Sequence, residues 1–164
     1  MQIRQEHPAD AAAIRDLTTA AFKDMAHSDQ TEADIVEALR SDGALTVSLV
    51  AIQDDEIIGH VALSPVVIVA AAGDWYGLGP VSVRPDRQGR GVGQALVRAG
   101  LERLGSLGAA GCVVLGDPDY YRRFGFESDP ALYYGEAPAS YFQRLILRGP
   151  APRGEVLYHS GLGE

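Results

Sequence analysis

The sequence has few of the side chains that build disulfides and metal centres. Its only cysteine, Cys112, has no second cysteine to pair with, which excludes an internal disulfide, and its apolar neighbours are typical of a small core residue. The four histidines do not cluster, so no metal is expected. The longest apolar run, at residues 66–72, is far too short to cross a bilayer. Charged residues among the first fifteen positions are unlike a signal peptide, and these absences together predict a cytoplasmic protein with no membrane partner.

Two common phosphate-binding motifs are missing as well. The dinucleotide fingerprint G-x-G-x-x-G fails because Gly91 and Gly93 are followed by no third glycine at the required spacing. A Gly-Lys-Ser/Thr triplet, which ends the P-loop, occurs nowhere in the chain. A nucleotide-binding domain of either fold is therefore disfavoured. There is no internal repeat, and the length predicts a single domain over residues 1–164.

Charge is unevenly distributed along the chain. The formal net charge is −8, yet residues 84–123 hold seven arginines and four acids, a net charge of +3 that leaves −11 on the rest. A basic segment suits an anionic ligand, and an acidic surround suits a cationic acceptor through electrostatic steering. The acids also fit the simpler role of keeping the protein in solution. The acidic balance argues against a nucleic-acid partner.

The chain is organised around a strand, a glycine-rich loop and a helix at residues 81–104. Val81 and Val83 alternate with polar residues in a short strand pattern, which Pro85 ends because proline has no N–H to donate. Three glycines then fall within five residues, and an apolar stripe at helical spacing follows them. We therefore expect a helix to start near Gly91.

A glycine-rich turn at the start of a helix can hold an anion. The first N–H groups of the helix lack acceptors, and the helix dipole adds partial positive charge at that end. Glycines leave these amides uncovered, so that a phosphate group can reach them. Arg87 and Arg90 are expected to add full positive charges beside this cradle.

Two segments carry a resemblance to a known family. Residues 88–93 (Gln-Gly-Arg-Gly-Val-Gly) resemble the Q/R-x-x-G-x-G/A pyrophosphate loop of the GNAT superfamily of acetyl-CoA-dependent N-acetyltransferases. Downstream, residues 121–126 (Tyr-Arg-Arg-Phe-Gly-Phe) resemble the family's Y-x-x-x-G-F signature. The resemblance covers residues 76–127 and is only topological elsewhere. It implies an α/β (mixed α+β) GNAT fold, with a mostly antiparallel mixed sheet of about six to seven strands, splayed between strands four and five and flanked by about four helices.

The resemblance also implies how acetyl-CoA would bind as cosubstrate. In the family, the pantetheine arm fills the gap between strands four and five, and the pyrophosphate meets the amides of the loop. The bulge that opens this gap is expected near residues 79–80. The cofactor-binding residues implied here are Val81, Ser82, Val83, Gln88, Gly89, Arg90, Gly91, Val92, Gly93, Gln94, Tyr121 and Phe124.

The implied chemistry is transfer of the acetyl group to a primary amine, of a small molecule or a protein, by direct attack without an acyl-enzyme. Tyr121 aligns with the family tyrosine that often protonates the departing CoA thiolate. A phenol of pKa about 10 can donate to a thiolate of pKa about 8.5, although Tyr121 could instead only pack against the cofactor. Tyr120 is the neighbouring alternative, one residue off the motif.

No general base is visible. Many family members carry a glutamate on the fourth strand, whereas residues 76–83 contain no acid here. Asp74, His60 or a water chain could serve, although His60 also fits an ordinary structural histidine. The missing acid leaves open an alternative function, a non-catalytic acyl-CoA-binding or sensing module, which the presence of Tyr121 opposes.

By the same resemblance, the loop after the first helix lines the acceptor site, which makes Phe22, Asp24, His27 and Ser28 acceptor-binding candidates. An aromatic-rich region at residues 132–142 could serve an interface, because the family often forms homodimers.

Three local patterns complete the predictions. Thr31 and Asp34 are spaced as in a helix-capping box, and Pro65 suggests a bulge or an edge within an apolar strand. Residues 141–147 and 155–158 look like closing strands.

Overall fold

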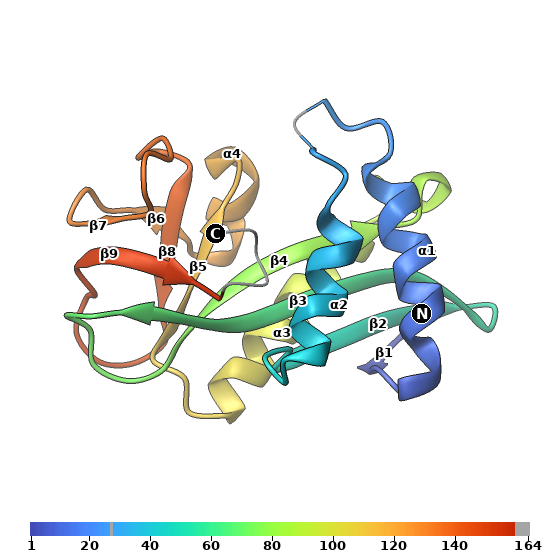
Figure 1. The fold of residues 1–164 in the computed structure, drawn as a ribbon, viewed down its shortest axis with the longest axis horizontal. Coiled ribbons are helices and arrows are strands. Elements are labelled where there is room, and N and C mark those ends of the chain that lie inside the picture. Colours follow the sequence, from blue (N-terminus) through green and yellow to red (C-terminus); the bar gives the residue numbers. More distant parts are fainter. Residues whose placement is uncertain (27, 160–164) are drawn as a thin grey trace.

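The computed structural model describes residues 1–26 and 28–159, which fold around one central β-sheet (Figure 1). The strands are β1 (Gln2–Gln5), β2 (Val47–Gln53), β3 (Glu56–Ile68), β4 (Trp75–Val83), β5 (Gly111–Leu115), β6 (Glu127–Ser128), β7 (Leu132–Tyr133), β8 (Phe142–Ile146) and β9 (Gly154–Tyr158). The helices are α1 (Ala11–Phe22), α2 (Glu32–Ser41), α3 (Val92–Ser106) and α4 (Pro118–Tyr121), with 3₁₀ turns at Pro8–Asp10, Pro85–Arg87 and Arg122–Phe124.

The sheet is mixed and mostly antiparallel, as expected. Its main path runs β1-β2-β3-β4-β5-β8-β6, and β9 pairs with the far end of β3 and with β7. Among the described strands, only the β4–β5 and β7–β9 pairs are parallel. The described residues form nine strands instead of six or seven, because β6 and β7 are two-residue pairings that no periodic pattern reveals.

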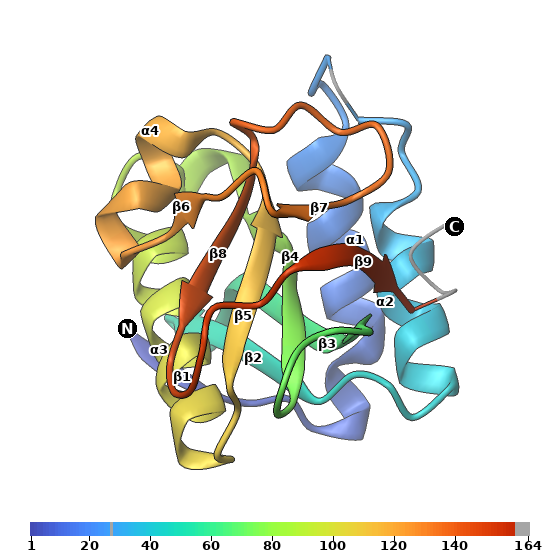
Figure 2. The same ribbon diagram turned by 90° about the vertical axis from the view of Figure 1, so that its left-hand side faces the viewer.

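Helices cover both faces of the sheet (Figure 2). On one face α1 and α2 pack together, and Ile14, Val36 and Val50 form a buried cluster beneath them. On the other face α3 packs against β2, β3 and β4, and the segment after β5 lies beside it, with the Arg98 guanidinium 4.9 Å from the centre of the Phe124 ring. Over residues 1–26 and 28–159, no helix is both long enough and apolar enough to span a membrane.

Gly59 allows α3 to approach β3 closely. A Cβ atom at this position would lie 2.8 Å from Leu96 Cδ1 and 2.9 Å from Val92 Cγ1. Both helix residues are buried. The first turns of α3 therefore rest directly on the strand, just after the glycine-rich loop enters the helix.

We expect Gly59→Ala to lower the free energy of unfolding by about 1–3 kcal/mol, because the added methyl group overpacks this contact. Denaturant unfolding measures the change. Gly105→Ala is the matched control, since Gly105 lies in α3 with no atom within 4 Å of an added Cβ. Alanine there should stabilise the protein by about 0.5–1 kcal/mol through helix propensity. Equal effects at both positions would contradict the close approach at Gly59.

β4 and β5 separate part of the way along their length. Their parallel pairing ends with Gly77 opposite Val113, and within the part of the chain that the structure describes β4 then continues to its end paired only with β3. The register between β3 and β4 shifts between Leu78 and Val81, which confirms the bulge expected near residues 79–80. The remainder of β4 therefore has a free edge on the side of β5.

Two local predictions have different outcomes. Pro65 lies inside a continuous β3, where the neighbour of that strand changes from β2, whose pairing ends at Leu63, to β9, whose pairing starts at Val66. Pro65 thus sits at a local edge. The capping box predicted at Thr31 is wrong, because the Asp29 carboxylate accepts both the hydroxyl and the amide of Thr31 and the hydroxyl makes no cap bond.

Candidate functional site

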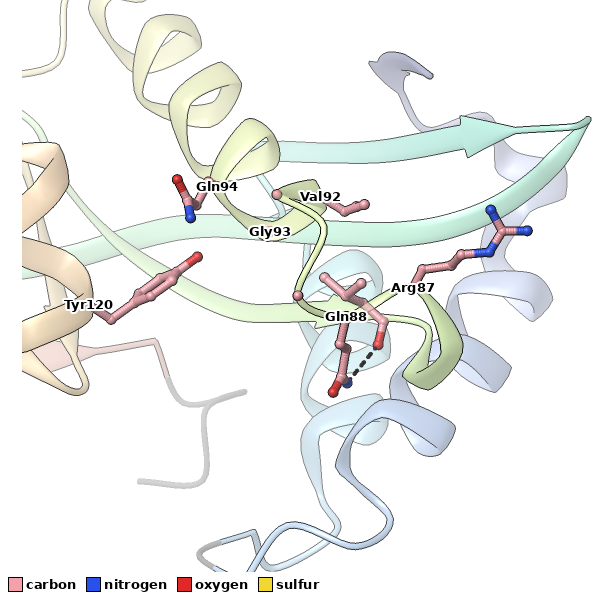
Figure 3. A pocket seen from close by; sticks show the side chains of 9 residues that line it. Arg87, Gln88, Val92, Gly93, Gln94 and Tyr120 are labelled. Atoms are coloured by element: carbon pink, nitrogen blue, oxygen red, sulfur yellow. Dashed lines mark hydrogen bonds between the residues drawn. The ribbon is translucent and has the colours of Figure 1, made fainter.

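A pocket of about 240 Å³ lies where the glycine-rich loop enters α3 (Figure 3). The end of β4, the loop, the first turn of α3 and one tyrosine of α4 enclose it. The lining residues are Val83, Arg87, Gln88, Gly89, Gly91, Val92, Gly93, Gln94 and Tyr120.

Gly91 gives the loop its shape. It is the N-cap residue of α3 and has a φ of +83°, in the left-handed region that glycine adopts readily. A Cβ on Gly91 would meet no atom within 4 Å, so this position faces open space. The Ala95 N–H donates to the Gly91 carbonyl at 3.0 Å, which leaves the amides of residues 92–94 as the first turn, without acceptors in the helix. This end of α3 suits an anion.

Two polar residues that line the pocket, Gln88 and Arg87, use their side chains in hydrogen bonds that brace the loop. The Gln88 side-chain amide donates to the Val83 carbonyl at 3.1 Å (Figure 3). The Arg87 guanidinium turns away from the loop and donates to Gln53 Oε1. Arg90 is exposed and does not line the pocket. Of the two arginines expected beside the cradle, Arg87 thus lines the pocket with its guanidinium directed toward Gln53, and Arg90 lies outside the lining.

The structure brings together part of the predicted cofactor site. The predicted residues that line the pocket are Val83, Gln88, Gly89, Gly91, Val92, Gly93 and Gln94, and those that do not are Val81, Ser82, Arg90, Tyr121 and Phe124. Two further residues line it: Arg87, which was expected only to add charge beside the cradle, and Tyr120, which was not assigned to cofactor binding. Tyr120 is adjacent to the motif tyrosine, Tyr121, and the two side chains project in different directions around the axis of α4.

Ser82 has its side chain on the opposite face of the sheet. It is buried beneath α1, where its hydroxyl donates to Thr18 Oγ1 at 3.3 Å. Val81 and Val83, on either side of it, pack toward the core under α3. Because side chains alternate along a strand, Ser82 can meet a ligand on the pocket side only through its backbone.

Tyr120 and Tyr121 stand almost perpendicular, with ring centroids 4.9 Å apart. The Tyr120 hydroxyl points toward the start of α3, where it would lie 3.3 Å from a Cβ on Gly93 (Figure 3). The Tyr121 ring instead packs over Gly116 at the end of β5 and edge-on against Phe126. Burial raises the pKa of Tyr121 to about 12, so its phenol keeps its proton at neutral pH.

Neither side chain considered as a general base lines the pocket. Asp74 is exposed in the turn before β4, at the end of that strand remote from the loop. His60 is fully buried on the α1 face, with Nε2 2.8 Å from Ser48 Oγ, and the Ser48 hydroxyl donates in turn to Glu6. A water chain remains as the third candidate.

We expect the protein to lose stability as the pH falls from about 6.5 to about 4, with His60 as a cause. Burial lowers the pKa of His60 to about 4, whereas an unfolded histidine titrates near 6.5. The unfolded chain therefore binds more protons than the folded protein across this window. As the pH falls through it, the free energy of unfolding decreases by up to about 1.4 kcal/mol per pH unit, and above about pH 6.5 His60 causes no change. Thermal unfolding at pH 7.5, 6 and 5 measures the loss. His60→Gln should flatten this dependence, and an unchanged slope would reject the assignment.

The loop between α1 and α2 holds another hollow, of about 300 Å³. It is lined by Phe22, Met25, Ala26, Ser28 and Glu32. Phe22 and Ser28, two of the four acceptor candidates, therefore lie together, and the Ser28 hydroxyl donates to the Glu32 carboxylate at 2.7 Å. Asp24 does not line this hollow, and His27 lies outside the described residues.

The sequence is similar to those of several acetyltransferases. The model of the Acetyltransferase (GNAT) family matches residues 11–126. The uncharacterized N-acetyltransferase YhbS of Escherichia coli (strain K12) is 43% identical over 128 residues, which cover 77% of this chain and 74% of that protein. The uncharacterized N-acetyltransferase YjhQ of the same strain is 34% identical over 123 residues, which cover 73% of this chain and 65% of that protein.

Two solved structures have the same fold and similar sequences. A GNAT family acetyltransferase from Brucella melitensis, in complex with acetyl-CoA, is 51% identical with a TM-score of 0.88, over 98% of this chain and 97% of that one. YhbS from Escherichia coli, in complex with CoA, is 36% identical with a TM-score of 0.90, over 99% of this chain and 92% of that one. With the glycine-rich loop and the splayed sheet already in place, these matches lead to one conclusion: the chain belongs to the GNAT family of acetyltransferases.

Proposed function

We propose that the protein transfers the acetyl group of acetyl-CoA to a primary amine of a small molecule or a protein. The observation that carries this proposal is the pocket at Gly91, which is lined by the first turn of α3 and by Val83 at the end of the free edge of β4. Coenzyme A has a pyrophosphate that fits the helix end and an extended amide-containing arm that fits a strand edge. The complexes of the two related structures with acetyl-CoA and CoA support the same ligand.

The residues proposed to hold acetyl-CoA come from three places. Val81 and Val83, with the backbone of Ser82, follow the arm along β4. Residues 88–94 surround the pyrophosphate. Tyr121 and Phe124 close the site from the segment after β5, and the hydroxyl of Tyr120 adds a donor at the loop.

The proposed reaction is direct attack by a neutral amine. The nitrogen lone pair forms a C–N bond to the acetyl carbonyl carbon, and the C–S bond breaks with its electron pair going to sulfur. Tyr121 is the proposed donor of the proton that converts the thiolate into the CoA thiol. The proton that the nitrogen loses restores the phenol through water, so the products are the acetylated amine and CoA.

A second candidate function is non-catalytic binding or sensing of an acyl-CoA. It is favoured by the absence of an acid at residues 76–83 and by the positions of Asp74 and His60 away from the pocket. The presence of Tyr121, the proposed proton donor, argues against it.

Calorimetric titration with acetyl-CoA tests the proposal, with NADH and ATP as controls. We expect acetyl-CoA alone to bind and a panel of primary amines to give amine-dependent thiol release. Tight binding without thiol release from any amine would favour the sensing module. Absence of binding would reject both functions.

A further inference from the structure

A hollow of about 180 Å³ opens onto the same gap between β4 and β5 from the other face of the sheet. It is lined by Leu78, Gly79, Pro80, Leu115, Tyr134 and Tyr158. Three of these residues belong to β4 at its bulge, and Leu115 is the last residue of β5. Strand alternation shows which face of the sheet the hollow is on. Leu78 packs in the core under α3, whereas the Tyr158 ring packs against its neighbour Gly77 on the opposite face. The gap between β4 and β5 therefore has the pocket at Gly91 on one face of the sheet and this hollow on the other.

Two tyrosine rings form the wall of the hollow. Tyr158 at the end of β9 and Tyr134 just after β7 meet edge to face, with centroids 4.7 Å apart. The Tyr158 ring rests on Gly77, where a Cβ would come within 2.6 Å of Tyr158 Cε1. Phe142 supports Tyr134 from behind, at 5.9 Å between centroids. Both rings are thus held in place by packing before any ligand arrives.

The lining of the hollow carries no charge. None of its six residues, all within the described chain, is an acid or a base. Burial raises the pKa of Tyr158 far above its ordinary value, so that phenol stays neutral as well. An ammonium group entering here would lose hydration without gaining a carboxylate, which is costly. A neutral amine attached to a hydrocarbon group would lose little and would bury its apolar surface against the rings.

Resting on the proposed acetyl transfer, we infer that the acceptor is a primary amine bearing an aromatic or similarly compact hydrocarbon group, which packs against Tyr134 and Tyr158. These two tyrosines are then specificity-determining residues. The amine binds as the free base, its nitrogen forms the new C–N bond, and the proton it releases ends on the CoA sulfur as the C–S bond breaks. A neutral bound amine needs no strong base, which agrees with the absence of an acid on β4.

The test compares 2-phenylethylamine with 1,4-diaminobutane, two primary amines of similar length that differ in a phenyl ring against a second amino group. With acetyl-CoA saturating, kcat/KM from thiol release should be at least about tenfold higher for 2-phenylethylamine, because the ring buries apolar area in the hollow. Titration of 2-phenylethylamine into the CoA-saturated protein by calorimetry gives a second readout that does not depend on turnover. It should show binding that 1,4-diaminobutane lacks.

Tyr134→Ala should remove most of this preference, while the Kd for acetyl-CoA stays within about twofold of its original value. Tyr133→Ala is the matched control, because Tyr133 is the adjacent tyrosine, is 49% exposed and does not line the hollow. A kcat/KM for 1,4-diaminobutane that equals or exceeds that for 2-phenylethylamine would overturn the inference, as would equal effects of the two substitutions. Either result leaves the proposed acetyl transfer standing. Absence of acetyl-CoA binding, or of thiol release with any amine, would overturn the proposed function and this inference together.

Discussion

Gly91→Glu is expected to raise the Kd for acetyl-CoA by at least about 100-fold. The new side chain would enter the open space at Gly91, in the pocket that the first turn of α3 lines, and would bring a negative charge to the proposed anion site. Hydrogen bonds from amides to a charged group contribute about 1.5–3 kcal/mol each, so the loss of two of them exceeds the roughly 2.7 kcal/mol of a hundredfold change. Calorimetric titration measures it.

Gly43→Glu is the control that separates binding from backbone strain. Gly43 follows α2, has a φ of +69° and, like Gly91, has no atom within 4 Å of an added Cβ. Both variants place a side chain in the left-handed region, at a cost of about 1–2 kcal/mol. Only Gly91→Glu should weaken the binding of acetyl-CoA. Unchanged affinity in Gly91→Glu would remove the loop from the binding site, and equal loss in both variants would point to general destabilisation.

Features set by local chemistry were predictable from the sequence. The start of α3 follows from glycines ahead of an apolar helical stripe, and the structure places the N-cap at Gly91. Two closing strands were expected within a few residues of β8 and β9. The bulge of β4, which the family resemblance implied, lies at a glycine followed by a proline. In each case, a residue with special backbone behaviour or a short periodic pattern carries the information.

Features that depend on distant pairings were not predictable. β6 and β7 are defined only by their partners, β8 and β9. The contact between the Tyr134 and Tyr158 rings is a further example. The parallel pairing of β7 with β9 brings these rings together, whereas the sequence shows only an aromatic-rich region. The orientation of α4 is another, since one residue step turns a side chain by about 100° around a helix. Motif spacing points to Tyr121, yet the pocket at Gly91 is lined by Tyr120.

That ambiguity makes a pair of tyrosine variants the decisive test of the chemistry. Tyr121→Phe is expected to lower kcat by about 100-fold, the lower range for loss of a general acid, with the Kd for acetyl-CoA within about threefold of the original. Tyr120→Phe should do the reverse, raising that Kd by about tenfold or more through one lost hydrogen bond to a charged group while changing kcat little. Each change removes one oxygen and keeps the ring, so the packing of Tyr121 against Phe126 is unaffected. Steady-state thiol release and calorimetry give the two constants.

The pH dependence adds an independent check on the acid. An acid must hold its proton to act, and a raised pKa moves the loss of activity to higher pH. Because burial raises the pKa of Tyr121 to about 12, kcat of the unmodified protein should not fall between pH 8 and 10.

The tyrosine variants have two other possible outcomes. If kcat falls in Tyr120→Phe instead, the acid is Tyr120, one residue before the tyrosine that the motif indicates. If neither variant changes kcat, neither phenol is the acid and the thiolate takes its proton from water.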